Sequence, residues 1–242
     1  MLTMEGITWH APGGIPIVDN IDLTIPDGKL VVITGPNGGG KTTLAKLIAG
    51  LETPDSGRIL LDEQDITDYD VTRRARCGIG YAFQQPVRFK GLTVRDLLEL
   101  AAGDTLGESA LCDLLSKVGL CARDYVDREV DASLSGGEIK RIEIATVLAR
   151  RTRLTVFDEP EAGIDLWSFA GLIDVFRDLR QSLNGSLLII SHQERILAIA
   201  DEIVVVADGR VQDQGPRSQI LPTLLSDGPR CGRCRGKEEA KL

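Results

Sequence analysis

The sequence predicts an α/β fold organised around a loop that binds phosphate. Residues 35–42, which read Gly-Pro-Asn-Gly-Gly-Gly-Lys-Thr, match the pattern G-x-x-x-x-G-K-[ST] at every fixed position. The apolar run at 29–34 has the composition of a buried strand, and residues 43–50 show helical periodicity and end in glycine. From residue 154 onward, strand and helix patterns alternate again.

The segments on either side of the loop predict mostly β structure. Residues 1–34 predict two or three strands, antiparallel to one another, with turns at Gly13-Gly14 and at 26–28. Beyond the loop we expect a strand at 58–61, a short helix near 71–76 and a strand-like run at 78–83.

The β pattern disappears between about residues 87 and 150, which predicts an all-helical subdomain inserted into the α/β domain. Thr93 and Asp96 form a capping-box pattern at the start of one helix. Apolar residues at 111–118 mark a second helix, and Ser135 is placed to cap a third.

The α/β pattern then continues to about residue 226. We expect strands at 154–157, 186–191, 203–207 and 210–214, and helices at 166–183, 193–200 and 217–225. The sequence therefore predicts one domain over 1–226. It is followed by a polar, mobile tail at 227–242 that contains the pair Cys231 and Cys234.

Composition and charge limit the classes of function. The chain has 28 basic and 36 acidic residues, a net charge of −8, which argues against a general binder of nucleic acid or of anionic membranes. No apolar run approaches the length of a membrane span, and the first residues lack the build of a signal peptide. We therefore expect a cytoplasmic protein.

The phosphate-binding loop predicts a site for a nucleoside triphosphate with Mg²⁺. Its glycines let backbone N–H groups point at a phosphate, and the following helix N-terminus adds partial positive charge. Lys41 is placed to reach the terminal phosphates, and the Thr42 hydroxyl to help hold the metal. The alternative is a glycine-rich turn that binds nothing, and the flanking strand and helix argue against it. The expected nucleotide-binding residues are Gly35, Pro36, Asn37, Gly38, Gly39, Gly40, Lys41, Thr42 and Thr43.

Two carboxylates at the end of a later strand complete a nucleotidase pattern. Asp158 and Glu159 directly follow the apolar residues 154–157, and strand ends are where an α/β sheet presents residues to a ligand. Asp158 is suited to hold Mg²⁺, and Glu159 to orient or deprotonate the attacking water. By itself such a pair is commonplace and would be a solvated turn; downstream of a complete phosphate loop it predicts catalysis.

A second anion site is predicted at the start of the third helix of the inserted segment. Ser135, Gly136 and Gly137 offer a hydroxyl and exposed N–H groups at a helix N-terminus. An ordinary capped turn would also use two adjacent glycines. A site so far along the chain from the first loop could serve a nucleotide held by a second copy of the protein.

These three motifs, in this order and spacing, resemble those of the ATP-binding-cassette (ABC) ATPases over roughly residues 2–226. The resemblance implies a RecA-like core, a helical subdomain and a head-to-tail homodimer with two ATP molecules at its interface. It also implies that Gln84 senses Mg²⁺ and the partner copy, that Asp165 crosses the dimer, and that His192 meets the γ-phosphate. Most family members stack adenine on an aromatic residue ahead of the loop; Trp9 is near that place, and could equally be a core residue.

Small departures from the common family pattern favour one branch. The runs Phe-Gln-Gln-Pro-Val at 83–87, Lys-Arg-Ile-Glu at 140–143, Glu-Ala-Gly-Ile-Asp at 161–165 and His-Gln-Glu-Arg-Ile-Leu at 192–197 resemble the SUF-system ATPase of iron–sulfur cluster assembly (SufC-like). This resemblance implies a soluble SufB/SufD-like scaffold as partner. Its expected docking surface is about 85–100, with Arg88, Phe89, Lys90 and Leu92; a loop packed on its own domain is the alternative.

Two other functions share the same nucleotide-site residues. One is the ATP-binding subunit of a membrane importer, in which case the chain would associate with a membrane permease. The other is a regulatory cassette protein that uses ATP-gated dimerisation as a switch. The tail pair Cys231 and Cys234 could supply half of a metal site, although an incomplete or redox-active pair is favoured because no second pair accompanies it.

Overall fold

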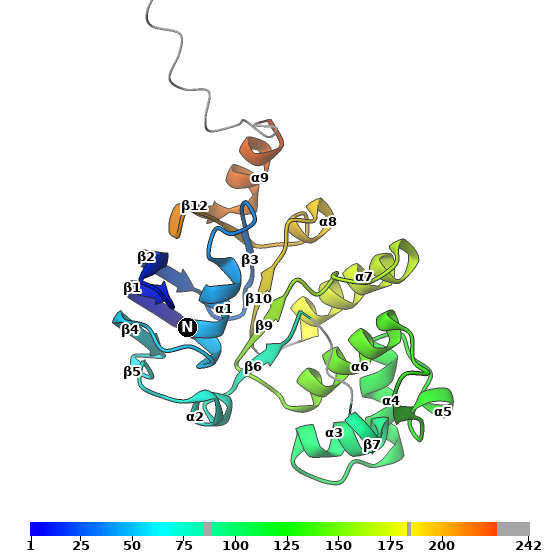
Figure 1. Ribbon diagram of the computed structural model, residues 1–242. Helices are drawn as coiled ribbons and strands as arrows, with labels where there is room; N and C mark the ends of the chain where they lie inside the picture. Colours follow the sequence, from blue (N-terminus) through cyan, green and yellow to red (C-terminus); the bar gives the residue numbers. More distant parts are fainter. Residues whose placement is uncertain (85–88, 183–184, 227–242) are drawn as a thin grey trace, which may run out of the picture.

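The computed structural model describes residues 1–84, 89–182 and 185–226, and it places a parallel sheet at the centre of the protein (Figure 1). This sheet has six strands in the order β12-β11-β3-β10-β9-β6, and only β12 runs antiparallel to its neighbour. Its strands are β3 (Leu30–Thr34), β6 (Ile79–Ala82), β9 (Leu154–Asp158), β10 (Ser186–Ile190), β11 (Glu202–Ala207) and β12 (Arg210–Pro216). The predicted α/β fold is confirmed.

A second, antiparallel sheet lies beside the first, in the order β2-β1-β4-β5. It consists of β1 (Leu2–Ala11), β2 (Ile15–Ile25), β4 (Ser56–Leu61) and the two-residue β5 (Gln64–Asp65). The antiparallel pairing expected ahead of the loop is therefore present. The sequence did not predict β5, because two residues are too few to show a period.

Between the two sheets lies α1 (Lys41–Ala49), the helix that follows the phosphate loop. Its apolar face, including Leu44, Leu47 and Ile48, joins a buried cluster with residues of both sheets. The short α2 (Val71–Arg76) begins at Asp70, whose carboxylate accepts a hydrogen bond from the N–H of Arg73 at 2.8 Å.

The segment expected to be all-helical contains four helices and also a small antiparallel pair of strands. The helices are α3 (Val94–Ala102), α4 (Glu108–Lys117), α5 (Ala122–Tyr125) and α6 (Gly136–Ala149), and β7 (Phe89–Thr93) pairs with β8 (Glu129–Val130). The all-helical expectation was wrong, because β8 has only two residues and its pairing with β7 spans a long stretch of sequence. The expected caps are present: Thr93 with Asp96, and Ser135 with Glu138, each form a capping box.

The C-terminal third provides α7 (Leu166–Ser182), α8 (Glu194–Leu197) and α9 (Arg217–Ser226), the last containing Pro222. The helix predicted at 193–200 is shorter than expected. The predicted tail, with Cys231 and Cys234, lies outside the described residues, as do Gln85, Pro86, Val87 and Arg88.

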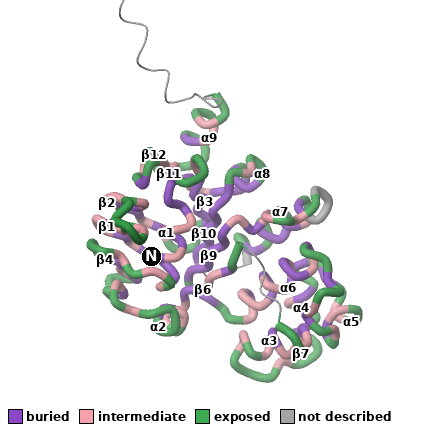
Figure 2. The backbone as a smooth tube through the Cα atoms, in the orientation of Figure 1, coloured by how far each residue is buried: buried purple, intermediate pink, exposed green. Residues whose placement is uncertain are grey.

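Both faces of the central sheet are buried, which fixes its register. In β3, Leu30 and Val32 pack into a cluster with α3, α4, α6 and α7, whereas Val31 and Ile33 pack into the cluster with α1 and the antiparallel sheet. The buried trace in Figure 2 follows these strands through the middle of the molecule. Such strands are continuous apolar runs, as expected for a parallel sheet covered on both sides.

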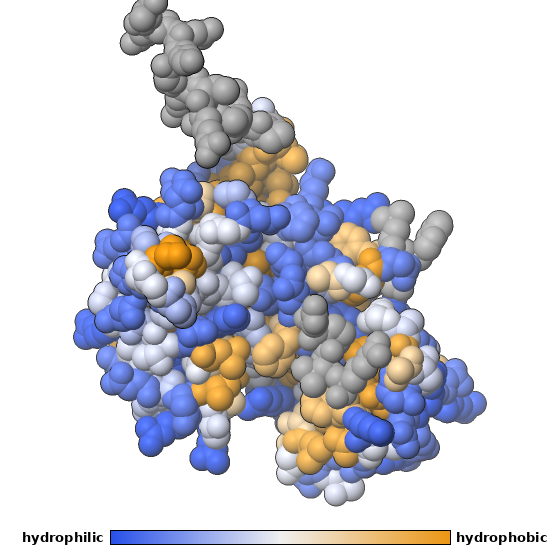
Figure 3. Space-filling view, in the orientation of Figure 1, coloured by the Kyte–Doolittle hydropathy of each residue, from blue (hydrophilic) through white to orange (hydrophobic). Residues whose placement is uncertain are grey.

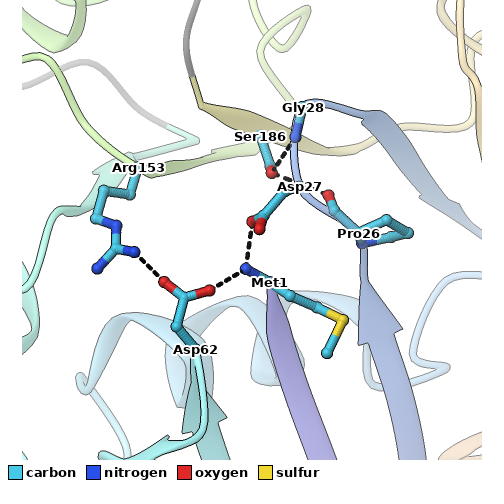
Figure 4. Close-up of polar contacts among 7 residues, drawn as sticks. All are labelled: Met1, Pro26, Asp27, Gly28, Asp62, Arg153 and Ser186. Carbon is cyan, nitrogen blue, oxygen red and sulfur yellow. Dashed lines mark hydrogen bonds and ion pairs between the residues drawn. The ribbon is translucent and has the colours of Figure 1, made fainter.

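Polar contacts join the two sheets at the edge of the central sheet away from the loop (Figure 4). The Met1 amine contacts Asp27 and Asp62, and Asp62 also contacts Arg153 just before β9. The Ser186 hydroxyl accepts from Gly28 N–H at 3.1 Å and donates to the Pro26 carbonyl at 2.9 Å. These bonds fix the turn before β3 against the start of β10.

A fully buried arginine holds the C-terminal end of α1. The Arg74 guanidinium donates to the carbonyls of Leu47, Ile48, Thr67 and Tyr69, and burial lowers its pKa to about 10. Carbonyls at a helix C-terminus lack partners within the helix, so a cation there satisfies them and interacts well with the helix dipole.

We expect Arg74→Met to lower the free energy of unfolding by about 3 kcal/mol, because buried carbonyls would lose their donors. Urea denaturation followed by circular dichroism measures this loss. Arg76→Met, at an exposed position of the same helix, is the matched control and should change stability little. Equal stabilities of the two variants would contradict the role of Arg74.

Candidate nucleotide-binding site

Neighbouring parallel strands of the central sheet end at one edge, and each is followed by a residue expected to bind nucleotide. The strands β3, β10, β9 and β6 lie side by side and run in the same direction. The phosphate loop follows β3, His192 follows β10, Glu159 follows β9 and Gln84 follows β6. Because parallel strands end together, residues that are far apart in the sequence meet at this edge.

The loop conformation depends on glycine. Gly35 has φ of 137° and Gly40 has φ of 99°, values that side-chain-bearing residues rarely adopt. A Cβ on Gly35 would lie 2.0 Å from the Val206 carbonyl oxygen of β11, and one on Gly40 would lie 2.7 Å from the Ile17 oxygen. The loop therefore packs against neighbouring backbone on both sides, and α1 begins directly after it with its N–H groups directed at the loop.

The Lys41 side chain folds back onto the phosphate loop. Its ammonium donates to the Gly35 carbonyl at 2.9 Å and to the Pro36 carbonyl at 2.8 Å, and the residue is only 6% exposed. Burial lowers the pKa of Lys41, while the nearby carboxylates of Glu159 and Asp158 act in the opposite direction. A phosphate would bring an anion to this buried cation.

The carboxylate of Asp158 is 2% exposed, and both its oxygens have hydrogen-bond donors. The Thr42 hydroxyl donates to Oδ1 at 3.2 Å, and the Tyr81 hydroxyl donates to Oδ2 at 3.0 Å. Burial raises the pKa of Asp158, and these two bonds oppose that shift. The sequence did not predict Tyr81, which pairs with Val156 in the register of β6 against β9, two residues before Asp158.

Gln84 and Glu159 meet through their side chains. The Gln84 amide donates to Glu159 Oε2 at 2.6 Å. Glu159 has φ of 45°, and its N–H donates to the Ile190 carbonyl of β10 at 3.0 Å. A left-handed backbone is uncommon for glutamate, and such conformations gather at functional sites, where surrounding bonds hold them.

The turn after β10 joins the turn after β9 through a buried hydroxyl. The Ser191 hydroxyl donates to Glu161 Oε1 and accepts from the Gln193 N–H at 3.0 Å. Burial raises the pKa of Glu161 above its usual range. The sequence showed the acid at 161 as a departure from the family pattern without indicating its partner, because only the strand pairing brings it to Ser191.

These residues surround a pocket of about 440 Å³. It is lined by Ile17, Asn37, Gly38, Gly39, Gly40, Lys41, Thr42, Thr43, Gln84, Glu159 and His192. Trp9 packs instead against the core of the antiparallel sheet, in agreement with its alternative as a core residue. A larger hollow of about 800 Å³, between α4 and the end of α6, contains none of the predicted nucleotide-site residues.

The Ser135 segment does not line this pocket, and it lies beside the segment that follows β9. Ser135 and Glu138 bond reciprocally at the N-terminus of α6, at 3.3 Å and 2.7 Å. A Cβ on Gly136 would lie 3.3 Å from the Gly163 carbonyl oxygen. Asp165 is exposed two residues further on. The second predicted anion site thus shares a surface with the 161–165 run, and it is separate from the pocket at the phosphate loop.

Lys140 links α6 to the residues around Gln84. Its side chain is 1% exposed, donates to the Phe83 carbonyl at 2.6 Å and pairs with Glu143 at 2.8 Å. The Phe83 N–H in turn donates to Glu143 Oε1 at 3.0 Å. Of the expected docking surface, Phe89 is 42% exposed, Lys90 is exposed, and Leu92 packs on the core. Figure 3 shows hydrophobic areas over this helical part of the molecule.

The fold and this pocket define a P-loop nucleoside triphosphatase. The family described as "ABC transporter" matches residues 18–162. A protein of Methanocaldococcus jannaschii, described as an uncharacterized ABC transporter ATP-binding protein, is 36% identical over 233 residues, which are 93% of this chain and 92% of that protein. The chain belongs to the ABC transporter family. Members of this family bind ATP with Mg²⁺ and hydrolyse it, so this chain is an ATPase.

Other relatives have named functions. The Fe(3+) ions import ATP-binding protein FbpC of Photobacterium profundum is 33% identical, covering 88% of this chain and 61% of that protein. The sulfate/thiosulfate import ATP-binding protein CysA of Synechocystis is 33% identical, covering 86% and 59%. The chain therefore spans about three fifths of the length of these importer subunits.

Solved structures agree on the fold. A nucleotide-free ATP-binding cassette from an ABC transporter superposes with a TM-score of 0.80 at 26% identity, covering 94% of this chain and 95% of that one. A dimeric post-hydrolysis cassette bound to ADP and phosphate has a TM-score of 0.78 at 22% identity, covering 90% and 99%. Among the described residues, no helix is long and apolar enough to cross a membrane.

We expect Lys41→Ala to weaken ATP binding about tenfold or more, because the phosphates would lose charge-assisted hydrogen bonds worth about 1.5–3 kcal/mol. Titration with a fluorescent ATP analogue measures the affinity. Lys46→Ala, which removes a cation from the last turn of the same helix, is the control and should bind normally. Unchanged affinity in Lys41→Ala would contradict the site.

Proposed function

We propose that this chain is the ATP-hydrolysing subunit of an ABC-type complex. Two copies form a head-to-tail dimer with two ATP molecules bound at its interface. The observation that carries this proposal is the division of the predicted site into two surfaces. One surface is the pocket with the phosphate loop, and the other holds Ser135–Gly137 beside the 161–165 run. A phosphate in the pocket of one copy would then face the α6 N-terminus of the other.

In this proposal different side chains bind the phosphates, activate the attacking water and contact the partner copy. Lys41 and the loop N–H groups hold the β- and γ-phosphates, and Glu159 orients and deprotonates the attacking water. His192 bonds the γ-phosphate, and Asp165 contacts the partner copy. Positioned donors and charges of this kind supply most of the barrier lowering in phosphoryl transfer.

The residues next to the loop fit Mg²⁺. The Thr42 hydroxyl and the Asp158 carboxylate lie 3.2 Å apart, and oxygen donors of this kind, together with phosphate oxygens and water, are what Mg²⁺ prefers. We propose that Thr42, Asp158 and Gln84 hold the ion. When bound, Mg²⁺ neutralises charge on the β- and γ-phosphates. Thr42 and Gln84 act as donors in their present bonds to carboxylates, so the hydroxyl oxygen of Thr42 and the amide oxygen of Gln84 remain available to the ion.

A membrane transporter is the partner that the comparisons favour. The relatives with named substrates are import ATP-binding proteins, at 33% identity over most of this chain. In this case the ATPase dimer would drive a permease. The substrate differs between these relatives, so none is assigned to this chain.

A SufB/SufD-like scaffold of iron–sulfur assembly is the second candidate partner, and the relatives' names give it no support. The observation that favours it is that four runs, at 83–87, 140–143, 161–165 and 192–197, resemble the SUF-system ATPase. Lys140 bonds the Phe83 carbonyl, and Glu161 bonds Ser191. Both contacts lie next to predicted nucleotide-site residues, Gln84 and His192, as expected for a branch with its own mechanism.

We expect Glu159→Gln to lower ATP hydrolysis by about a hundredfold or more and to trap an ATP-bound dimer, because binding survives without the water-activating carboxylate. Size-exclusion chromatography with and without ATP measures the dimer. Adding Ser135→Arg should abolish that dimer by blocking the composite site. A dimer that persists in the double variant would contradict the head-to-tail arrangement.

We expect affinity capture of the tagged chain from its own cells to identify the partner. Membrane and soluble fractions are captured separately, and Glu159→Gln with ATP holds the complex closed. Recovery of a multi-span permease supports the transporter function, and recovery of a soluble SufB/SufD-like protein supports the second candidate. Recovery of neither favours a regulatory cassette.

A further inference from the structure

Glu161 has a buried carboxylate oxygen that no partner satisfies. Its Oε1 accepts from the Ser191 hydroxyl, whereas Oε2 is buried and has no hydrogen-bond partner among the described residues. An unpaired buried carboxylate oxygen is costly, so native proteins rarely leave one without a reason. Glu161 also belongs to one of the four runs that depart from the common family pattern.

His192 is a neighbouring side chain that can donate a hydrogen bond to this oxygen. It directly follows Ser191, and of the charges that act on the pKa of Glu161 it is the one that favours the carboxylate. The His192 side chain lines the nucleotide pocket, and its Nε2 atom lies 3.5 Å from the Gln193 amide nitrogen, at the outer limit of a hydrogen bond. A contact of this length constrains the direction of the ring only weakly.

We propose that Glu161 is a positioning residue for His192, accepting a ring N–H on Oε2 when ATP occupies the pocket. An imidazole bonded to a carboxylate on one side presents its other nitrogen in a fixed direction, here toward the γ-phosphate. The inference rests on the proposed role of His192. It deepens that role, because it names the group that orients the ring.

The same contact would couple phosphate sensing to dimer closure. Glu161 belongs to the segment that carries Gly163 past Gly136 on the surface proposed to meet the partner copy. A shift of this segment on closure would move the carboxylate relative to Ser191 and His192. The ring would then be oriented only in the closed state.

The test combines Glu161→Gln with His192→Ala. The glutamine keeps an acceptor for the Ser191 hydroxyl but replaces one carboxylate oxygen with an amide donor, so we expect kcat to fall about tenfold or more with ATP affinity unchanged. The double variant should have the same kcat as His192→Ala alone, because both substitutions disrupt the same Glu161–His192 pair. Glu194→Gln, an exposed carboxylate close to His192, is the matched control and should keep full activity.

A spectroscopic measurement separates positioning from a structural role. The chain has two histidines, and His10, bonded to Asp55 at 2.8 Å, is an internal reference. In the Glu159→Gln background, ATP with Mg²⁺ should shift the imidazole nitrogen signals of His192, and adding Glu161→Gln should remove that shift while His10 stays unchanged. Provided that His192→Ala is inactive, three results would each overturn the inference. They are a normal kcat in Glu161→Gln, losses of kcat that add up in the double variant, and a His192 signal shift that survives Glu161→Gln. Full activity of His192→Ala would instead overturn the proposed role of His192, and this inference with it.

Discussion

The parallel pairing of β3 with β10, and of β9 with β10 and β6, is the constraint on which the site depends. Each strand is buried on both faces, so its register is fixed by the two apolar clusters it separates. The four chain segments that follow these strands consequently meet at one edge. A one-residue slip of β9 would exchange the faces of its side chains and turn Asp158 away from Thr42 and Tyr81.

Polar groups at the pocket are hydrogen-bonded to one another, and these bonds limit what nucleotide binding must do. Lys41 bonds loop carbonyls, Thr42 bonds Asp158, and Gln84 bonds Glu159. A phosphate must compete with the loop carbonyls for the Lys41 ammonium. Glu161 differs from these groups, because its buried Oε2 has no hydrogen-bond partner among the described residues. In the arrangement proposed for Glu161 and His192, binding would tighten the contact between the turns after β9 and β10.

Features that depend on residues close together in the sequence could be predicted from the sequence. The phosphate loop, the Thr93–Asp96 capping box, the Ser135 cap and the carboxylates Asp158 and Glu159 could be predicted from residues a few positions apart. The contacts of Tyr81 with Asp158 and of Glu161 with Ser191 could not, since each joins different strands and depends on register. The β7–β8 pair was missed for the same reason: Phe89 meets Val130 only after the intervening helices have packed.

Two residues in the runs that depart from the common family pattern make contacts inside the domain. Lys140 is 1% exposed and connects α6 to the Phe83 carbonyl beside Gln84, so it cannot touch a permease or a scaffold directly. Glu161 connects the 161–165 run to the buried Ser191, the residue before His192. The relatives' names concern transport, whereas these contacts lie within the ATPase domain itself. The contacts therefore leave the choice between a permease and a scaffold open to the capture experiment.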